Sequence, residues 1–156
     1  MRNLISAVFV FLLGASQSAS AGEAWTLDSQ IDGKGKTCSL SRMDQGRPFS
    51  ITLAFVPATT DQGVIRLSFN EPKLMQDARK ALATLEFSNG ASESHRVEVA
   101  PSGTIQIPIV ALTVDDVLQT FSESQRLTVA TRFGSTSFSL EGIAKRIPAL
   151  RDCASS

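Results

Sequence analysis

Apolar and polar residues alternate with a period of two in several short runs of this chain, and this pattern predicts β-strands with one buried face. The longest runs are Phe49–Val56 and Val64–Asn70, and weaker candidates lie at Trp25–Ile31 and Thr37–Met43. Pro108 lacks an amide hydrogen, so its run is expected near an edge or an end of a sheet. The residues predicted to point inward are Phe49, Ile51, Leu53, Phe55, Ile65, Leu67, Phe69, Leu85, Phe87, Val97, Val99, Ile105, Ile107 and Ile109.

Turn-forming residues separate these runs. Asp61-Gln62-Gly63 divides the first two long strands, and Asn89-Gly90 opens a longer loop between Phe87 and His95. The best-defined turn is Phe133-Gly134-Ser135-Thr136, because Gly-Ser at the two central positions fits a type II′ hairpin. All residues paired by that register fall on one predicted apolar face. The expected pairs are Phe133 with Thr136, Thr131 with Phe138, and Val129 with Leu140.

Two segments change to a helical period. The first begins near Pro72, which suits a first helical turn, and the second is expected to be capped by Thr113 with Asp116 three residues on. Their apolar stripes are Leu74, Met75, Ala78, Ala81 and Leu82 in the first, and Val114, Val117, Leu118 and Phe121 in the second. Ile143, Ile147 and Leu150 share a third helical face, which Pro148 is expected to divide into two short turns.

These patterns together predict a mainly β fold. We expect an antiparallel β-sandwich of about nine strands with two short inserted helices and a C-terminal helical segment. Residues 22–156 are long enough to bury the core of one such domain.

The first 21 residues predict a secretory signal peptide. A basic start at Met1-Arg2 precedes the apolar run Leu4–Ala15, and Ala19-Ser20-Ala21 fits a cleavage site. An uncleaved membrane anchor is the alternative, but a spanning helix needs about 20 apolar residues. We therefore expect a periplasmic or secreted protein with no stable membrane insertion after cleavage.

Cys38 and Cys153 are the two cysteines of the chain. Export delivers a protein to an oxidising compartment, where a disulfide between them is expected. Two free thiols or an intermolecular bridge are the alternatives. In the chain-entropy model, closing so long a loop stabilises the folded state by about 4–5 kcal/mol.

The charges exclude two classes of partner. Loss of Arg2 with the signal leaves 14 basic residues against 15 acidic ones, and the two signs are dispersed. A nearly neutral chain without a basic stripe lacks the electrostatic footprint of a nucleic-acid or anionic-membrane binder.

Candidate catalytic groups are few. His95 is the only histidine, so one imidazole at most is available to a zinc site or a Ser-His-acid triad. We expect His95 to be a solvated loop residue. No GxSxG elbow or phosphate-binding glycine loop is present. Asp115 and Asp116 suit the first turn of a helix, where acidic side chains complement the helix dipole. We expect neither metal nor cofactor, and we expect Glu93 and Glu98 to be isolated.

Two glycine-containing turns, Asp32–Lys36 and Asn89–Ser94, are the candidate surfaces for a protein partner. Both are equally compatible with solvated loops. Trp25 is the only tryptophan and the chain has no tyrosine, so exposed aromatic residues for stacking on a carbohydrate are scarce. We expect Trp25 to cover the core.

Residues near both ends of the mature chain carry a family resemblance. Ala24-Trp25-Thr26 is followed by Cys38, and the strand Phe138–Gly142 is followed by Ala144, Leu150 and Cys153. This early Trp…Cys and late Phe-x-Leu-x-Gly…Ala…Leu…Cys resemble small periplasmic proteins of the invasion-associated locus B type from alphaproteobacteria. Members often carry extra cysteines in the middle, which this chain lacks. The resemblance implies a secreted, disulfide-linked β-sandwich and supplies no catalytic residues.

We therefore expect a non-enzymatic envelope protein that acts in stress tolerance or host association through an unknown protein partner. A periplasmic inhibitor, for example of lysozyme, and a small ligand-binding module are the alternatives. A hydrolase whose site is assembled only by the fold is a further one.

Overall fold

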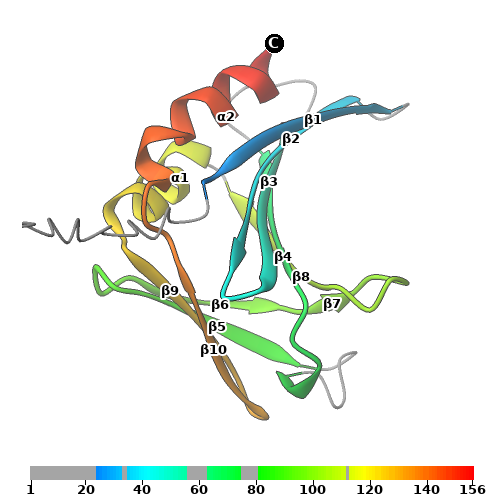
Figure 1. The fold of residues 1–156 in the computed structure, drawn as a ribbon, viewed down its shortest axis with the longest axis vertical. Helices are drawn as coiled ribbons and strands as arrows, with labels where there is room; N and C mark the ends of the chain where they lie inside the picture. Colours follow the sequence, from blue (N-terminus) through cyan, green and yellow to red (C-terminus); the bar gives the residue numbers. More distant parts are fainter. Residues whose placement is uncertain (1–23, 33–34, 56–62, 75–80, 112) are drawn as a thin grey trace, which may run out of the picture.

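The computed structural model describes residues 24–32, 35–55, 63–74, 81–111 and 113–156, and its strands form two antiparallel sheets (Figure 1). The strands are β1 (Thr26–Asp32), β2 (Gly35–Asp44), β3 (Arg47–Phe55), β4 (Gly63–Phe69), β5 (Leu82–Phe87), β6 (Ser92–Arg96), β7 (Glu98–Val99), β8 (Ile105–Ala111), β9 (Arg126–Thr131) and β10 (Gly134–Ser139). The helical elements are η1 (Pro72–Leu74), α1 (Val114–Glu123), η3 (Ile143–Lys145) and α2 (Ile147–Ser155). The mainly β, two-sheet prediction is confirmed.

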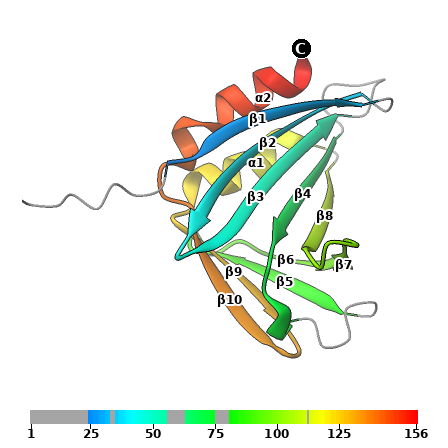
Figure 2. The same cartoon turned by 45° about the vertical axis from the view of Figure 1, so that its right-hand side comes forward.

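The two sheets are stacked and cross each other. The six-stranded sheet has the order β1-β2-β3-β4-β8-β7, and the four-stranded sheet has the order β10-β9-β5-β6. The four-stranded sheet covers one end of the larger sheet, while α1 and α2 lie at its other end (Figure 2). The core therefore lies between one face of the large sheet and two different covering layers.

The predicted alternation matches the buried faces of β3, β4, β5 and β8. Every predicted inward residue of these strands whose side chain is described is buried; the side chain of Phe55 lies outside the described part. Pro108 lies opposite Arg66 of β4, and β7 pairs only with Ile105 and Gln106 on the other side of β8. Among the described strands, β8 is thus an edge at Pro108, as predicted.

Val99 is the exception to this pattern. Its side chain is 43% exposed, although the alternation placed it inward with the buried Val97. The chain leaves one sheet and enters the other at Val97, since β6 pairs with β5 and β7 pairs with β8. When a chain segment passes from one sheet to the other, the alternating set of residues that faces the core also changes. The prediction for Val99 is wrong for that reason.

The turn between β5 and β6 is shorter than predicted. The Gly90 amide donates to the Phe87 carbonyl at 2.9 Å, the Phe87 amide donates to the Ala91 carbonyl at 2.8 Å, and β6 begins at Ser92. The predicted longer loop up to His95 is therefore a tight turn followed by a strand.

The β9–β10 hairpin exists, but its predicted register is wrong. Thr131 lies opposite Gly134, Val129 opposite Thr136, and Leu127 opposite Phe138, so Arg132-Phe133 forms the turn. The Thr131 hydroxyl accepts a hydrogen bond from the Phe133 amide at 3.2 Å, which favours a turn that begins at threonine. The two registers differ by an even number of residues. Thr136, Phe138 and Leu140 therefore keep their predicted inward face and are buried.

The first inserted helix is described only as the short turn η1, where Leu74 is buried. Met75 and Ala78 lie outside the described residues. Leu82 belongs to β5 and is 63% exposed, so its place on a helical stripe is wrong. The strand pairing of residues 82–87 outweighs the helical spacing there.

The second inserted helix, α1, is confirmed. Val114, Leu118 and Phe121 are buried and Val117 packs against the core. Thr113 occupies the N-cap position, but its hydroxyl bonds to the Asp116 carboxylate and to no backbone amide.

The C-terminal segment is divided, as predicted, but the break lies at Arg146, before Pro148, and the second part is a nine-residue helix instead of a short turn. The η3 turn ends at Lys145, and α2 begins at Ile147 with Pro148 in its first turn, where the missing amide hydrogen costs least. A disulfide joins Cys153 of α2 to Cys38 of β2, with the Cα atoms 6.1 Å apart. It fastens the last helix across the inner face of the large sheet (Figure 1).

Residues 1–21, the predicted signal peptide, lie outside the described part. No helix within the described residues is long and apolar enough to cross a membrane.

Candidate functional site

The residues with candidate chemistry in the sequence do not form one site. His95 lies in β6, half-buried, with its Nε2 atom 3.0 Å from the Glu93 carboxylate. It is therefore a strand residue and not the solvated loop residue that was expected, and Glu93 is not isolated. Glu98 lies on the short strand β7. The described residues contain no cluster of three or more His, Cys, Asp or Glu side chains that could hold a metal ion.

The paired aspartates at the start of α1 have structural contacts. Asp115 forms an ion pair with Arg151 of α2, and Asp116 accepts a hydrogen bond from the Thr113 hydroxyl. Trp25 is buried, as predicted, and its indole N–H donates to the Glu141 carbonyl at 2.9 Å.

Two seams join the sheets, and they are built differently. At the strand seam, defined as β6, Val97 and β7, one chain segment passes from the small sheet to the large one. At the side-chain seam, Asp44 and Arg47 of the β2–β3 hairpin reach β10, the edge strand of the small sheet. The Asp44 carboxylate accepts from the Ser139 amide at 3.0 Å, and Arg47 donates to the Ser137 carbonyl at 3.1 Å.

Arg47 makes several contacts at the side-chain seam. It bonds to the Thr136 hydroxyl and the Glu71 carboxylate, and its guanidinium lies 5.2 Å from the centre of the Phe138 ring. Asp44 is buried, so its carboxylate replaces the backbone acceptor that a neighbouring strand would supply to Ser139. Side chains fill this seam only in part, and a pocket remains beside it.

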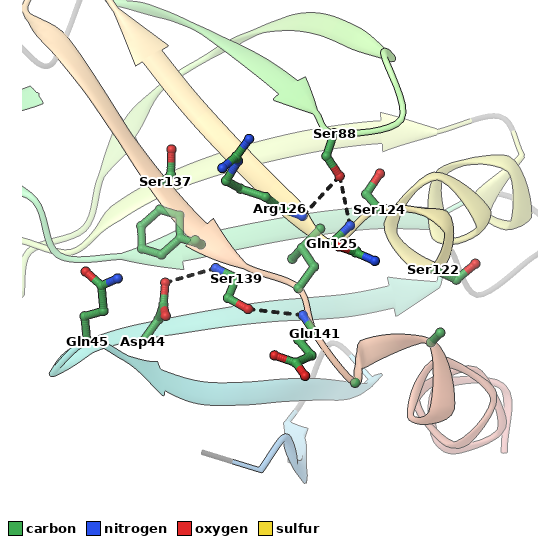
Figure 3. A pocket seen from close by; sticks show the side chains of 14 residues that line it. Asp44, Gln45, Ser88, Ser122, Ser124, Gln125, Arg126, Ser137, Ser139 and Glu141 are labelled. Carbon is green, nitrogen blue, oxygen red and sulfur yellow. Dashed lines mark hydrogen bonds between the residues drawn. The ribbon is translucent and has the colours of Figure 1, made fainter. Parts of the chain in front are cut away.

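The pocket has a volume of about 700 Å³ and is rich in serine (Figure 3). Its lining comes from the β2–β3 turn, the β5–β6 turn, the end of α1 with the start of β9, β10, and the segment after β10. The polar lining residues are Asp44, Gln45, Ser88, Ser122, Ser124, Gln125, Arg126, Ser137, Ser139 and Glu141. We call this cavity the serine pocket.

Hydrogen bonds hold the walls of the serine pocket in place. The Ser88 hydroxyl accepts from the Gln125 amide at 2.9 Å and from the Arg126 amide at 3.3 Å. The Ser139 hydroxyl accepts from the Glu141 amide at 3.3 Å. These bonds join the β5–β6 turn to the start of β9, and β10 to the segment after it, as the dashed lines in Figure 3 show. These walls are therefore fixed relative to one another by the fold.

The floor and the rim of the serine pocket differ in exposure. Asp44, Ser124, Phe138 and Leu140 are buried and form the floor. The exposed rim residues are Gln45, Ser88, Gln125, Arg126, Ser137 and Glu141. The Ser124 hydroxyl is the one buried floor atom without a hydrogen-bond partner among the described residues. An unpaired buried hydroxyl is destabilising, so this atom is a candidate contact for a ligand or an ordered water.

The chemistry of the serine pocket is hydrogen bonding with fixed charges of both signs. Hydroxyl and amide groups can donate and accept, Asp44 and Glu141 supply carboxylates, and Arg126 supplies a cation. Sequence reasoning did not find this site, because the wall segments are far apart in the chain. One feature of the sequence could have indicated it. Asp44 is an even number of residues from Cys38 and Leu40, so its side chain points to the same buried face of the strand. A carboxylate on a buried face needs a polar partner.

No protein-family model, curated protein or solved structure matches this chain.

Proposed function

We propose that this chain is an exported, non-enzymatic protein of the cell envelope that binds a partner protein through the serine pocket. Support for export comes from the predicted signal peptide together with the Cys38–Cys153 disulfide, since disulfides persist in oxidising compartments. The resemblance to periplasmic proteins of the invasion-associated locus B type points to the same compartment. A role in stress tolerance or host association belongs to this proposal.

The observation that carries the proposal is the exposed rim of the serine pocket. Sites for small molecules enclose most of the surface of their ligand. Here Gln45, Ser88, Gln125 and Arg126 are all exposed, so the pocket is an open depression on the surface. An open, polar depression fits side chains that project from a larger partner, with the rim making contacts around them.

The lining also indicates the chemistry of that partner. Serine hydroxyls and glutamine amides can both accept and donate hydrogen bonds, which suits a hydroxyl, an amide or a stretch of exposed backbone. Arg126 and Glu141 stand on the rim with opposite charges, so a partner residue of either sign finds a complement. We therefore expect a polar segment of the partner to enter the pocket.

Capture from a periplasmic extract with a pocket-filling variant tests the proposal. Gln125→Trp fills the pocket and keeps the bond to Ser88, because Gln125 makes that bond through its backbone amide. Gln30→Trp is the matched control, since Gln30 is exposed on β1 and does not line the pocket. We expect wild type and Gln30→Trp to retain the same partner and Gln125→Trp to lose it. Equal capture by all three proteins, or no partner at all, would contradict the proposal.

A small polar ligand is the second candidate, because the unpaired Ser124 hydroxyl lies in the floor. Thermal unfolding in the presence of amino acids, dipeptides and simple sugars tests it. A rise in melting temperature that Gln125→Trp abolishes and Gln30→Trp retains would favour this candidate.

An inhibitor of lysozyme would be a particular case of partner binding. The Asn89-Gly90 turn adjoins Ser88 on the rim of the serine pocket, whereas residues 33 and 34 of the other candidate loop lie outside the described part. Lysis of bacterial cells by lysozyme with and without excess protein is the direct measurement, and undiminished lysis would exclude this case.

A further inference from the structure

A second cavity, of about 460 Å³, shares the Glu141-Gly142 turn with the serine pocket but has different chemistry. Its walls include Trp25, Arg42, Lys145 and Arg146. Three cations and one carboxylate, that of Glu141, therefore surround one hollow. The complete chain has a formal net charge of zero, so this local excess of two positive charges is a distinct feature of the surface.

The cations of this cavity form no ion pair with any of the described residues. No ion pair between described residues involves Arg42, Lys145 or Arg146, and the Glu141 carboxylate is likewise outside every such pair. Lys145 and Arg146 are exposed, one at the end of η3 and the other directly after it. Their charges are thus available to a ligand.

Arg42, in the wall of the cavity, is held in position by two contacts. One of its terminal nitrogens donates to the Glu141 carbonyl at 3.2 Å, and its guanidinium lies 5.5 Å from the centre of the Trp25 ring. Trp25 is fixed in turn by its own bond to Glu141 and by an edge contact with Phe49. The Arg42 Nε atom is buried and has no hydrogen-bond partner among the described residues. This guanidinium is therefore rigid but incompletely hydrogen-bonded.

We infer that this cavity is a binding site for a phosphate group. Phosphate carries several acceptor oxygens, which a guanidinium fork and two flexible cations can bind together. A dianion neutralises the excess of two positive charges, whereas a carboxylate neutralises only one of them. The fixed position of Arg42 lowers the entropy lost on binding. The site is separate from the serine pocket in chemistry and does not depend on the proposed function.

Trp25 provides the measurement, because it is the only tryptophan and forms part of the wall. Protein purified from the periplasm of the expression host is titrated with inorganic phosphate at constant ionic strength, and tryptophan fluorescence is recorded. Sodium chloride and sodium acetate are titrated in parallel. We expect a saturable change with phosphate, at least tenfold weaker binding of acetate, and no saturable change with chloride.

Two double variants decide whether the response belongs to this cavity. Lys145→Gln/Arg146→Gln removes two exposed cations of the site and should weaken phosphate binding at least tenfold. Lys73→Gln/Arg96→Gln removes two exposed cations that do not line it and should bind like wild type. Circular dichroism checks that both variants fold. Equal weakening by the two variants, acetate binding as tight as phosphate binding, or a linear response to phosphate would overturn the inference.

Sedimentation with phosphatidylcholine vesicles that contain phosphatidic acid identifies the source of the phosphate. Co-sedimentation that Lys145→Gln/Arg146→Gln abolishes assigns a lipid headgroup. If the protein binds inorganic phosphate but stays in the supernatant, the natural ligand is a soluble phosphorylated molecule. Both results support the site.

Discussion

At the strand seam a single chain segment passes between the two sheets, whereas at the side-chain seam two charged residues reach across a gap. In the first case the connection is backbone: β6 and β7 pair with opposite sheets, and the Val97 amide donates to the Ala81 carbonyl at 3.2 Å. In the second it is Asp44 and Arg47 acting on the edge of β10. A backbone connection tolerates many side chains, but a side-chain connection depends on the identity of two residues.

The difference also explains where the serine pocket lies. Paired strands leave no room between them, because the backbones stand about 4.8 Å apart. Side chains that bridge two elements leave space beside each bridge, and the pocket occupies this space next to Asp44 and β10. The side-chain seam is thus the one that offers a binding surface.

The largest effect is expected when the disulfide that anchors β2 to α2 is removed. Cys38→Ser/Cys153→Ser removes the link between α2 and β2, the strand that carries Asp44, and should lower the free energy of unfolding by about 2–5 kcal/mol. Guanidinium unfolding gives this value. Hydrogen exchange should rise in α2 and β2 before it rises at β6 and β7. Faster exchange at the strand seam first would contradict the comparison.

Asp44→Ala breaks the side-chain seam directly. The Ser139 amide loses its acceptor, and a lost bond to a charged group should cost about 2–3 kcal/mol. Asp44→Asn keeps an acceptor oxygen and should lose clearly less. Urea unfolding of the two variants compares them; an asparagine variant as unstable as the alanine variant would show that the hydrogen bond is not the cause.

Val97→Ala is the corresponding change at the strand seam. The backbone connection remains and only buried methyl groups are lost, so we expect a decrease of about 1–2 kcal/mol in the free energy of unfolding. Amide exchange at β6 and β7 should remain protected. A loss larger than that of Asp44→Ala would reverse the ranking of the two seams.

The smallest effect is expected at Ser124. Its buried hydroxyl has no partner among the described residues, so Ser124→Ala should leave stability unchanged or raise it by up to about 1 kcal/mol. Ser88→Ala is the contrast, since the Ser88 hydroxyl accepts two backbone amides. Thermal unfolding distinguishes them, and a marked loss in Ser124→Ala would reveal a partner of this hydroxyl.

Features that depend on local spacing could be predicted from the sequence. The inward residues of β3, β4 and β8 follow a period of two, and Pro148 indicated an interruption of the C-terminal helical segment, although α2 in fact begins just before it. The pairing of Cys38 with Cys153 followed from their number. In each case the deciding information lies in one short segment or in a count.

Features that depend on the packing of distant segments could not be predicted. The phase of Val99 changes because the chain changes sheets at Val97, and no residue near it signals that change. The observed register of β9 and β10 is accompanied by a hydrogen bond from the Phe133 amide to the Thr131 hydroxyl, and the Gly-Ser pair fits another register locally just as well. The serine pocket arises only when five wall segments meet at one corner of the fold.

The disulfide also determines when during biogenesis the chain can be oxidised. Cys38 and Cys153 are 115 residues apart. On the export route proposed above, the bond can form only after the whole stretch from Cys38 to Cys153 has reached the oxidising compartment, so oxidation follows the translocation of that stretch. Chains retained in a reducing cytosol would lack this bond, and we expect proteases to remove their C-terminal residues first.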